Sequence, residues 1–521
     1  MSEIPLKSVN PAERNMLRDV LSYIPALLIP ALLNIVTLLI FPRLFSLETY
    51  GQWILVLNTL NIGTGIVSQW LGQSVQRYLP LYQAREEEAL FLHFLLLFLL
   101  LFFTSLLIAA LGFYVPFFAL FSDWRMLYWP LFGLMLFQSL FFLLSALFQS
   151  NFKVRMYRIC QIAVSILKLA FALGLLVFVS RSVNAVIYGY LLALVLVCAP
   201  MVRASGMRLR PPPMIDYFQA FRFFGTLMLR YGMPMIGWLI GTLILTGSDR
   251  YLIQWLLDTG AVGIYGGIYA LVAGLVNLCA APLLVVAHPV LMRAAEQESD
   301  DELQLRISGF SRYFLLIAVP LLAFAIVFHA ETVQVFLGEE FSVYSPLMPL
   351  LTAGMLIWNF ALYGQKGHEI KNRTLSLMII VWLSALFNIV FNIDSIRSYG
   401  IYAAGISALS SFVVYILLIY LSSRKILAWR LKEVLTARLA FVFIVSVMLL
   451  FALRIGFLLP LPLNPFAVLS IGGFLFIFLY PGLLAVFGVL TDDEREIVKR
   501  SIGRFAGGRS AFFFKNNREE D

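Results

Sequence analysis

The chain contains fourteen long apolar segments, and these constrain its fold more than any other feature. A helix needs about 20 mostly apolar residues to cross a bilayer. Only 13% of the residues are charged, whereas soluble proteins contain about 25%. The sequence therefore predicts an all-α polytopic membrane protein with about 14 transmembrane helices. The segments lie near residues 20–42, 51–72, 89–115, 126–149, 157–180, 184–203, 231–257, 262–291, 313–336, 344–365, 374–396, 399–422, 437–459 and 464–489.

The basic residues predict the orientation of these helices. If the N-terminus lies inside and the segments alternate, 31 of the 38 Lys and Arg residues fall on inner segments. Lys168 and Arg250 lie within spans, and the five outer ones are Arg43, Arg125, Arg181, Arg397 and Arg454. Positive charge collects on the cytoplasmic side of membrane proteins, so both termini are predicted to be cytoplasmic. The net charge of +9 then indicates contact with anionic membrane lipids rather than with nucleic acid.

The segments divide into two halves of six. Residues 1–210 form the first predicted half, and residues 211–230 form a polar linker that carries a short interfacial helix. Residues 231–422 form the second half, residues 423–490 add two helices, and residues 491–521 are a charged cytoplasmic tail. The second and eighth segments open with similar patterns, Tyr50-Gly51 and Tyr265-Gly266. This similarity indicates that the halves are repeats of each other.

The seventh segment carries the strongest candidate for a functional site. Asp249 and Arg250 are charged, and charged residues inside a span face a bundle interior or a water-filled cavity. Gly247 and Ser248 directly before them predict an interrupted helix, in which Ser248 or Asp249 caps a second half-helix. Neighbouring helical residues point about 100° apart, so Asp249 and Arg250 each need a different partner. We expect this pair to face a central cavity or the seam between the halves.

Several short patterns together resemble one family of membrane transporters. They include Pro234, the triplet Asp249-Arg250-Tyr251, and Gly263 followed two residues later by Tyr265. The first half adds the run from Ser46 to Gly51 and the run from Arg77 to Pro80. In this order and spacing, the patterns resemble the polysaccharide (lipid-linked oligosaccharide) flippases of the multidrug/oligosaccharidyl-lipid/polysaccharide superfamily.

The resemblance implies a fold, a substrate and a location. The fold would be MATE-like, with two six-helix lobes around a central cavity and two further C-terminal helices. The substrate would be an undecaprenyl-diphosphate-type lipid-linked oligosaccharide, moved from the inner to the outer leaflet of a bacterial cytoplasmic membrane for surface polysaccharide synthesis. A polysaccharide polymerase and chain-length proteins are the implied partners. Related lipid II flippases carry several arginines in the early helices, whereas segment 20–42 here has none.

Further polar residues inside the spans are candidates for the substrate pathway. Lys168 suits either a counter-charge for a diphosphate or for Asp249, or a structural ion pair. Arg77 suits either a lipid headgroup or a loop salt bridge, or capture of the diphosphate at the cytoplasmic mouth. The remaining candidates share two interpretations, hydrogen bonding between helices or lining of the cavity. They are Asn58, Asn61 and Gln69 in the second segment, and Asn388 and Asn392 in the eleventh.

A lipid II flippase is one alternative function, and two functions of other kinds also compete with the polysaccharide flippase. A multidrug or organic-cation antiporter of the same superfamily should have acidic residues in its first half, but the first six segments contain no buried Asp or Glu. A membrane glycosyltransferase or polymerase needs carboxylates in a sizeable outer loop, and the longest predicted outer loop spans only about residues 330–343. The sequence has no phosphate-binding G-x-x-x-x-G-K-[ST] loop and no zinc-like histidine cluster, so no cofactor is expected. Coupling to a proton or sodium gradient stays open.

Overall fold

The computed structural model describes residues 11–120, 125–151, 153–207, 217–458, 460–490 and 494, and every regular element in these ranges is helical. All fourteen predicted segments are largely helical, which confirms the all-α prediction. The first seven helices are α1 (Pro11–Leu44), α2 (Leu47–Thr64), α3 (Trp70–Ala84), α4 (Glu88–Leu120), α5 (Arg125–Ser150), α6 (Val154–Phe178) and α7 (Val183–Ser205).

The second half of the chain continues in the same way. It contains α8 (Tyr217–Leu256), α9 (Thr259–Gln297), α10 (Asp300–Phe336), α11 (Leu347–Gly364), α12 (Lys366–Ile370), α13 (Thr374–Tyr399), α14 (Ile401–Ser423), α15 (Leu431–Val434), α16 (Ala437–Leu453) and α17 (Pro465–Val486). Within the described residues, twelve helices are long and apolar enough to cross a membrane, where α2 and α3 count as one. The other two predicted segments lie in α8 and in α1, whose apolar part is the shorter stretch Leu28–Leu44.

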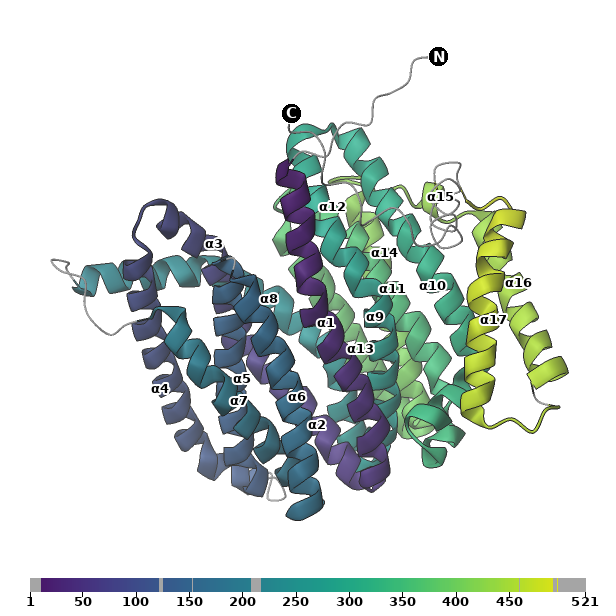
Figure 1. The fold of residues 1–521 in the computed structure, drawn as a ribbon, viewed down its shortest axis with the longest axis horizontal. Helices are drawn as coiled ribbons and strands as arrows, with labels where there is room; N and C mark the ends of the chain where they lie inside the picture. Colours follow the sequence, from purple (N-terminus) through teal and green to yellow (C-terminus); the bar gives the residue numbers. More distant parts are fainter. Residues whose placement is uncertain are drawn as a thin grey trace, which may run out of the picture.

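The helices form two bundles and a separate pair (Figure 1). In the first lobe, α1 packs on α6, and α5, α6 and α7 pack on one another. In the second lobe, α8 packs on α13, and α11 packs on α10 and α14. The pair α16 and α17 lies at the edge of the second lobe, where a small apolar core of its own joins it to α10.

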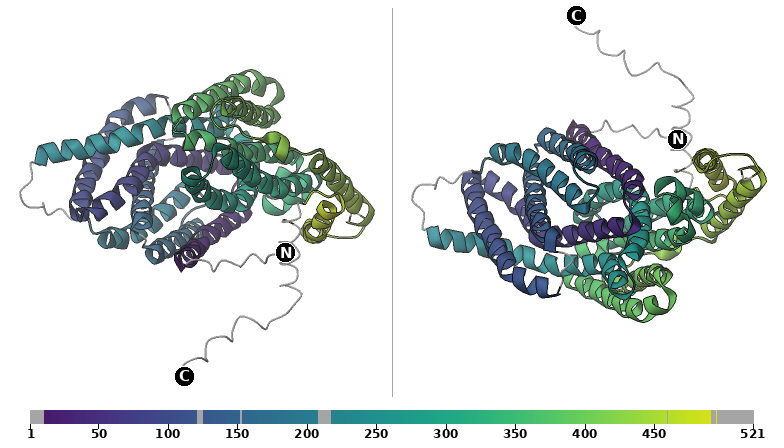
Figure 2. Two further views of the ribbon diagram at one scale, coloured as in Figure 1. Left: turned by 90° about the horizontal axis from the view of Figure 1, so that it is seen from above. Right: turned by 90° about the horizontal axis from the view of Figure 1, so that it is seen from below.

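Helix α8 connects the two lobes. Its teal ribbon extends from one bundle to the other in both views of Figure 2. Phe224 in its first turns packs against Phe91 of α4, with ring centroids 5.3 Å apart. Residues 217–230 were predicted to be part of a linker with a short interfacial helix. That prediction is wrong in part, because this stretch packs on the first lobe and continues without a break into the seventh segment.

The lobes meet where α2 and α9 begin, at the predicted outer side. A Cβ atom on Gly51 would overlap the carbonyl oxygen of Thr259, and one on Gly263 would overlap the carbonyl oxygen of Leu47. Glycine at both positions therefore allows the two backbones to touch. The repeated Tyr-Gly openings of the sequence lie in these two helices, so the repeat places two equivalent helices against each other.

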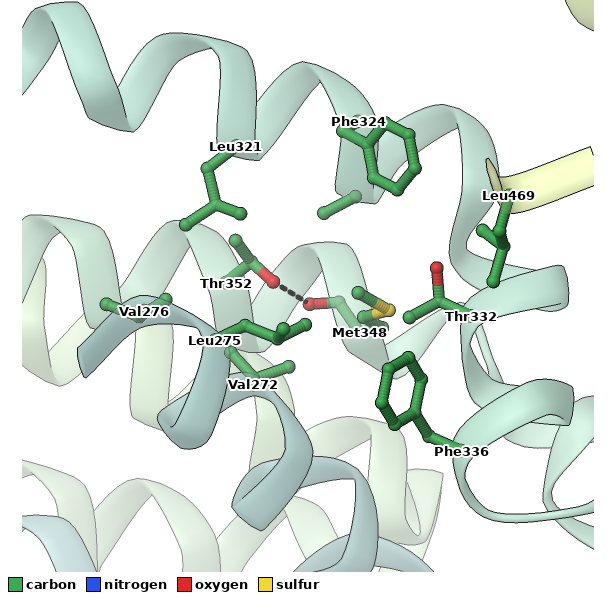
Figure 3. A pocket seen from close by; sticks show the side chains of 11 residues that line it. Val272, Leu275, Val276, Leu321, Phe324, Thr332, Phe336, Met348, Thr352 and Leu469 are labelled. Carbon is green, nitrogen blue, oxygen red and sulfur yellow. Dashed lines mark hydrogen bonds between the residues drawn. The ribbon is translucent and has the colours of Figure 1, made fainter. Parts of the chain in front are cut away.

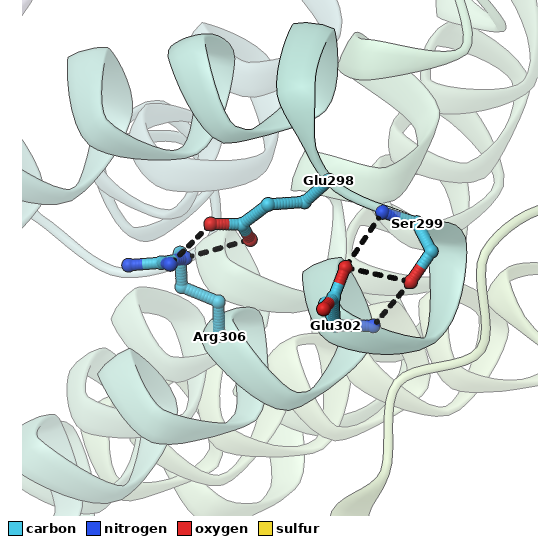
Figure 4. Close-up of polar contacts among 4 residues, drawn as sticks. All are labelled: Glu298, Ser299, Glu302 and Arg306. Carbon is cyan, nitrogen blue, oxygen red and sulfur yellow. Dashed lines mark hydrogen bonds and ion pairs between the residues drawn. The ribbon is translucent and has the colours of Figure 1, made fainter.

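Six of the described helices begin at a side-chain cap that the sequence supplies, and three of these caps lie at the starts of α2, α9 and α10. Ser46 accepts a hydrogen bond from the amide of Thr49 at 3.2 Å, and Asp258 accepts one from Ala261 at 2.7 Å. Figure 4 shows the capping box at the start of α10, where Ser299 and Glu302 bind each other's backbone amides. Such caps satisfy amides that have no partner within their own helix. They fix the turns that join α1 to α2, α8 to α9, and α9 to α10.

The described helices depart from regular α-helix at three places that differ from the predicted one, and one of these is the π-helical segment Arg454–Leu458 directly after α16. Between α2 and α3, residues Gly65–Gln69 form a π-helical turn. In α10, Phe328 has non-helical backbone angles, φ −111° and ψ 24°, which kink the helix. The interruption that was predicted at Gly247-Ser248 is absent, since α8 is helical throughout Tyr217–Leu256.

Candidate functional site

Asp249 lies at the centre of a buried polar cluster. Only 1% of its surface is exposed, and it accepts hydrogen bonds from two different helices. The hydroxyl of Tyr265 on α9 donates to Oδ2 at 2.8 Å, and the amide of Asn392 on α13 donates to Oδ1 at 2.7 Å. Asp249 therefore points into the second lobe, between α8, α9 and α13, rather than toward the lobe seam. Buried carboxylates need such donors to offset the loss of water.

The two predicted asparagines extend this cluster along α13. Asn388 and Asn392 are four residues apart, so they share a helix face, and both are fully buried. Oδ1 of Asn388 accepts from Ser248 on α8 at 3.1 Å and from Asn392 at 3.1 Å. On its other side, Asn388 donates to the hydroxyl of Ser407 on α14 at 3.4 Å. Both asparagines thus bind helices together, which is one of the two predicted interpretations.

Arg250 has separate partners, as the 100° divergence predicted. Its guanidinium donates to the carbonyl oxygen of Thr246 at 2.7 Å and lies 4.0 Å from the ring centroid of Tyr269 on α9. The side chain is 8% exposed. A cation over an aromatic face is attracted by the electrons of the ring, more strongly where water is excluded. Tyr265 and Tyr269 therefore hold the acid and the base of α8 on one face of α9.

The glycine of the predicted break has a different role. Asn58 on α2 donates to the carbonyl oxygen of Gly247 at 2.9 Å, and a Cβ atom at Gly247 would lie 2.8 Å from Oδ1 of Asn58. The missing side chain therefore lets α2 approach α8. Ser248 forms its hydrogen bond with Asn388 and caps no half-helix. The sequence predicts a break at Gly247-Ser248 because glycine and serine often interrupt spanning helices. The same two residue types also allow close helix packing, and the sequence alone does not distinguish the two roles.

Of the polar residues in the second segment, some contact α8 across the interface between the lobes and others do not. Besides the bond of Asn58 to Gly247, Thr59 shares a hydrogen bond with Tyr251 of α8 at 2.7 Å. Asn61, one turn further along α2, is exposed, and Gln69 is half-buried in the π-helical turn. π-Turns within helices are frequent at functional sites. The structure therefore joins Asn58, but neither Asn61 nor Gln69, to the elements around Asp249.

The two remaining basic candidates lie in the first lobe. Lys168 on α6 donates to Gln138 on α5 at 2.6 Å, and its ammonium lies 5.2 Å from the ring centroid of Tyr190 on α7. Among the described residues no carboxylate lies within ion-pair distance of Lys168, so it is not the counter-charge of Asp249. Arg77 is exposed on α3, 5.8 Å from the ring centroid of Tyr78. The predicted site residues thus fall into a second-lobe cluster and separate first-lobe positions.

The described residues contain no group of three or more His, Cys, Asp or Glu side chains that could hold a metal ion. The Asp249 cluster offers a different donor set, made of carboxylate, amide and hydroxyl oxygens. Oδ1 of Asn392 is buried and has no hydrogen-bond partner. Oxygen ligands of this kind suit hard cations or a proton rather than zinc.

Tyr265, Tyr269 and Ser407 complete the cluster, and the sequence alone does not assign them to it. Tyr265 and Tyr269 are four residues apart and share a helix face, but the sequence shows them only as members of a short repeated pattern at the start of the eighth segment. Ser407 carried no signal, because single serines are common in membrane helices. Asp249-Arg250 and Tyr265 belong to the same family pattern, and this common occurrence was the signal that could have predicted a contact between α8 and α9.

A separate cavity lies away from all of these residues. It has a volume of about 260 Å³ and lies between α9, α10, α11 and α17 (Figure 3). Its lining is apolar apart from Thr332 and Thr352, and both hydroxyls donate to carbonyl oxygens of their own helices. No charged side chain lines it, so it contributes nothing to the charge cluster around Asp249.

A family model described as "Polysaccharide biosynthesis protein" matches residues 40–346, which is more than half of the 521-residue chain. The chain belongs to this family. The match confirms the predicted family and covers α2 to α10, including Asp249, Arg250 and Tyr265. A comparison with curated proteins finds no match.

Solved structures of transporters have the same fold. A structure described as "Lipid II flippase MurJ, inward closed conformation" has a TM-score of 0.71 at 15% identity and covers 90% of this chain and 98% of its own. An inward-facing multidrug resistance MATE transporter has a TM-score of 0.61 at 12% identity, with 77% of this chain and 97% of its own covered. An outward-facing MATE transporter reaches 0.52 at 13% identity, with 78% and 95% covered.

These comparisons confirm the MATE-like architecture. Identities of 12–15% establish the fold and not the substrate. The family match identifies a polysaccharide biosynthesis protein, and its fold is that of the multi-pass membrane transporters to which it is similar. The TM-score is higher for the inward-facing than for the outward-facing MATE structure.

Proposed function

We propose that this family member moves a lipid-linked oligosaccharide of the undecaprenyl-diphosphate type from the inner to the outer leaflet by alternating access. The product would feed the synthesis of a surface polysaccharide such as O-antigen, capsule or exopolysaccharide. The observation that carries the proposal is the match to a polysaccharide biosynthesis family on a chain with a flippase-like fold. A glycan has to cross the membrane before it can be assembled at the surface.

The charges within the spans support an anionic substrate. Lys168 in the first lobe has a neutral partner, Gln138, and Arg250 in the second lobe has a carbonyl and an aromatic ring. Within the part of the chain that the structure describes, no carboxylate forms a hydrogen bond with either cation, so both keep attraction for a diphosphate. Arg77 at the predicted cytoplasmic end of α3 would meet the diphosphate first. Asn61 and Gln69 would line the path of the sugars.

We further propose that the Asp249 cluster couples transport to a cation gradient. A carboxylate that is 1% exposed holds its charge only while donors or a cation stabilise it. Asn392 Oδ1 lacks a donor, and Ser248, Asn388 and Ser407 add oxygens from α8, α13 and α14. Binding of a proton or a sodium ion here would rearrange contacts between these helices. The same helix α8 contacts α2 across the seam through Gly247, which links the cluster to the lobe interface.

The first lobe argues for a flippase over a multidrug antiporter. Its spans hold Lys168 and no buried Asp or Glu among the described residues, so an organic cation would meet repulsion there. The proposed location is the cytoplasmic membrane of a bacterium, with both termini on the cytoplasmic side. A polysaccharide polymerase and chain-length proteins are the proposed partners, because they act on the same lipid-linked repeat unit.

Deletion of the gene in a strain without paralogues tests the proposal. We expect loss of one surface polysaccharide and accumulation of its undecaprenyl-linked repeat unit on the cytoplasmic leaflet, with unchanged drug tolerance. Complementation with the wild-type chain should restore export. Intact glycan export with increased drug sensitivity would instead identify a multidrug transporter. Accumulation of lipid II with cell lysis would identify a lipid II flippase.

A further inference from the structure

A second polar site lies at the predicted cytoplasmic rim of the second lobe, far along the chain from Asp249. It is a pocket of about 650 Å³, within the usual range of about 300–1,000 Å³ for ligand sites. Three short stretches line it, namely the first residue of α10, the turn between α12 and α13 together with the first turn of α13, and the end of α14 together with the residues after it. The lining residues are Asp300, Lys371, Arg373, Ser376, Ser422, Lys425 and Ile426.

The pocket has an excess of positive charge. Lys371 forms an ion pair with Asp300 at 2.7 Å, which neutralises one of the three cations. In the part of the chain that the structure describes, no carboxylate lies within ion-pair distance of Arg373 or Lys425. The hydroxyls of Ser376 and Ser422 lie in the same lining. Two uncompensated cations beside two hydroxyls are a donor set for a phosphate group.

The backbone around the pocket holds these side chains in place. Asn372 adopts a left-handed conformation, with φ 55°, which turns the chain between Lys371 and Arg373. The amide of Arg373 donates to the carbonyl oxygen of His368 at 2.8 Å. The ring of His368, which is fully buried, shares a hydrogen bond of 2.8 Å with Ser422. On the α10 side, the capping box and the ion pair of Glu298 with Arg306 fix the turn before Asp300 (Figure 4).

The surroundings of the pocket identify the source of the phosphate. In the helical turns next to the pocket residues Ser376 and Ser422, α13 and α14 carry side chains that are at least half exposed, Leu375 and Ile379 on one helix and Leu417 and Leu421 on the other. Each pair is four residues apart, so each forms an apolar strip along its helix. In a membrane these strips face the acyl chains, while basic residues at the rim attract anionic headgroups.

We propose that this pocket binds the phosphate of an anionic phospholipid of the inner leaflet. Arg373 and Lys425 bind the phosphate oxygens, Ser376 donates a further hydrogen bond, and the acyl chains lie on the strips of α13 and α14. Lys371 stays paired with Asp300 and adds no net charge. The bound lipid holds the cytoplasmic end of α13, the helix that carries Asn388 and Asn392, at the level of the lipid headgroups. This binding is independent of the transported substrate.

Native mass spectrometry of the purified full chain with phosphatidylglycerol or phosphatidylcholine tests the proposal. The double variant Arg373→Gln with Lys425→Gln should bind phosphatidylglycerol about 30-fold more weakly, the change expected when two basic residues each contribute about 1 kcal/mol. The matched control, Arg424→Gln with Lys432→Gln, removes two exposed cations outside the pocket and should bind like the wild type. Equal loss in both double variants would overturn the proposal, because it would show only general surface charge.

Two further arms separate binding from folding and lipid from free phosphate. Asp300→Asn releases Lys371 and should strengthen phosphatidylglycerol binding, whereas a merely structural pocket would lose binding or stability. Unchanged or weaker binding by a folded Asp300→Asn protein would contradict the charge argument. Inorganic phosphate should compete poorly, since it lacks acyl chains. Displacement of phosphatidylglycerol by inorganic phosphate at equal concentration, or equal binding of phosphatidylcholine, would overturn the lipid assignment.

Discussion

The side-chain amide of Asn392 donates to the carboxylate of Asp249 across 2.7 Å, and this contact joins α13 to α8 in the interior of the second lobe. Both residues are at most 1% exposed. The two residues are 143 positions apart in the sequence, so the contact forms only when α8 and α13 have packed together in the second lobe. It holds the carboxylate of Asp249 where water cannot stabilise it. Asp249 lies on α8, the helix that also contacts the first lobe.

Asn392→Ala should destabilise the protein. The substitution removes a donor to a buried carboxylate, and such a loss costs about 1–3 kcal/mol, or more for a charged group. The unfolding temperature of the purified protein measures the effect. Asn61→Ala is the matched control, because Asn61 is exposed and lies outside the cluster. Equal unfolding temperatures for the two variants would show that the contact adds nothing to stability.

Gly51→Ala should weaken the contact between the lobes. The new methyl group would overlap the carbonyl oxygen of Thr259, and overpacking of this kind costs about 1–3 kcal/mol. Gly112→Ala is the control, because no atom lies within 4 Å of the added methyl group there. Alanine also favours helix over glycine by about 1 kcal/mol, so the control should be neutral or slightly stabilised. Thermal unfolding of both variants checks the difference in sign, and a stabilised Gly51→Ala would refute the close approach of α2 and α9.

The membrane helices could be predicted from the sequence because length and apolarity decide them locally. Each of the fourteen predicted segments is largely helical, even though α8 begins fourteen residues earlier than predicted. The interruption at Gly247 could not be judged in the same way. Its role depends on Asn58, 189 residues away, and a glycine that lets a neighbour approach has the same sequence as one that breaks a helix.

The candidate site was predicted in its parts and not in its arrangement. The sequence predicts site residues at polar positions inside spans, because polar groups there are costly without partners. The structure brings four of them to the region between α8, α9 and α13, namely Asp249, Arg250, Asn388 and Asn392. Lys168 is predicted as a site residue for the same reason, since it is a charged residue inside a span, but it lies in the first lobe and donates to Gln138. Spacing along one helix predicts a shared face, whereas the pairing of distant helices depends on the packing of the whole lobe.

Removing one partner of the Glu331–Arg454 ion pair should detach α16 from α10. The pair spans 2.7 Å, and the two side chains are 10% and 21% exposed. Loss of one partner of a buried pair costs about 3–5 kcal/mol, because the other charge stays buried without compensation. Glu331→Ala should therefore lower the unfolding temperature and increase proteolysis between α14 and α16. The double variant Glu331→Leu with Arg454→Met should lose clearly less stability, and an equal loss would exclude the buried-charge explanation.

Reporter fusions test the predicted orientation. Fusions after Thr259 and Gly338 should report an outer location, and fusions after Glu86, Ser299 and Ser423 should report the cytoplasm. The expectation follows from the 31 basic residues on the predicted inner segments. A reversed reading at Ser299 or Ser423 would contradict the assignment of two six-helix lobes with both termini inside.

Transport by the purified protein in liposomes tests the central proposal most directly. The measurement is the fraction of a fluorescent undecaprenyl-diphosphate-linked oligosaccharide that becomes accessible in the opposite leaflet, divided by the amount of inserted protein. We predict transport by the wild type, none by Arg250→Ala at equal insertion, and partial transport by Arg250→Lys, because ammonium keeps the charge but not the planar stacking on Tyr269. No movement of the lipid by the folded wild type, or equal transport per molecule by Arg250→Ala, would contradict the account.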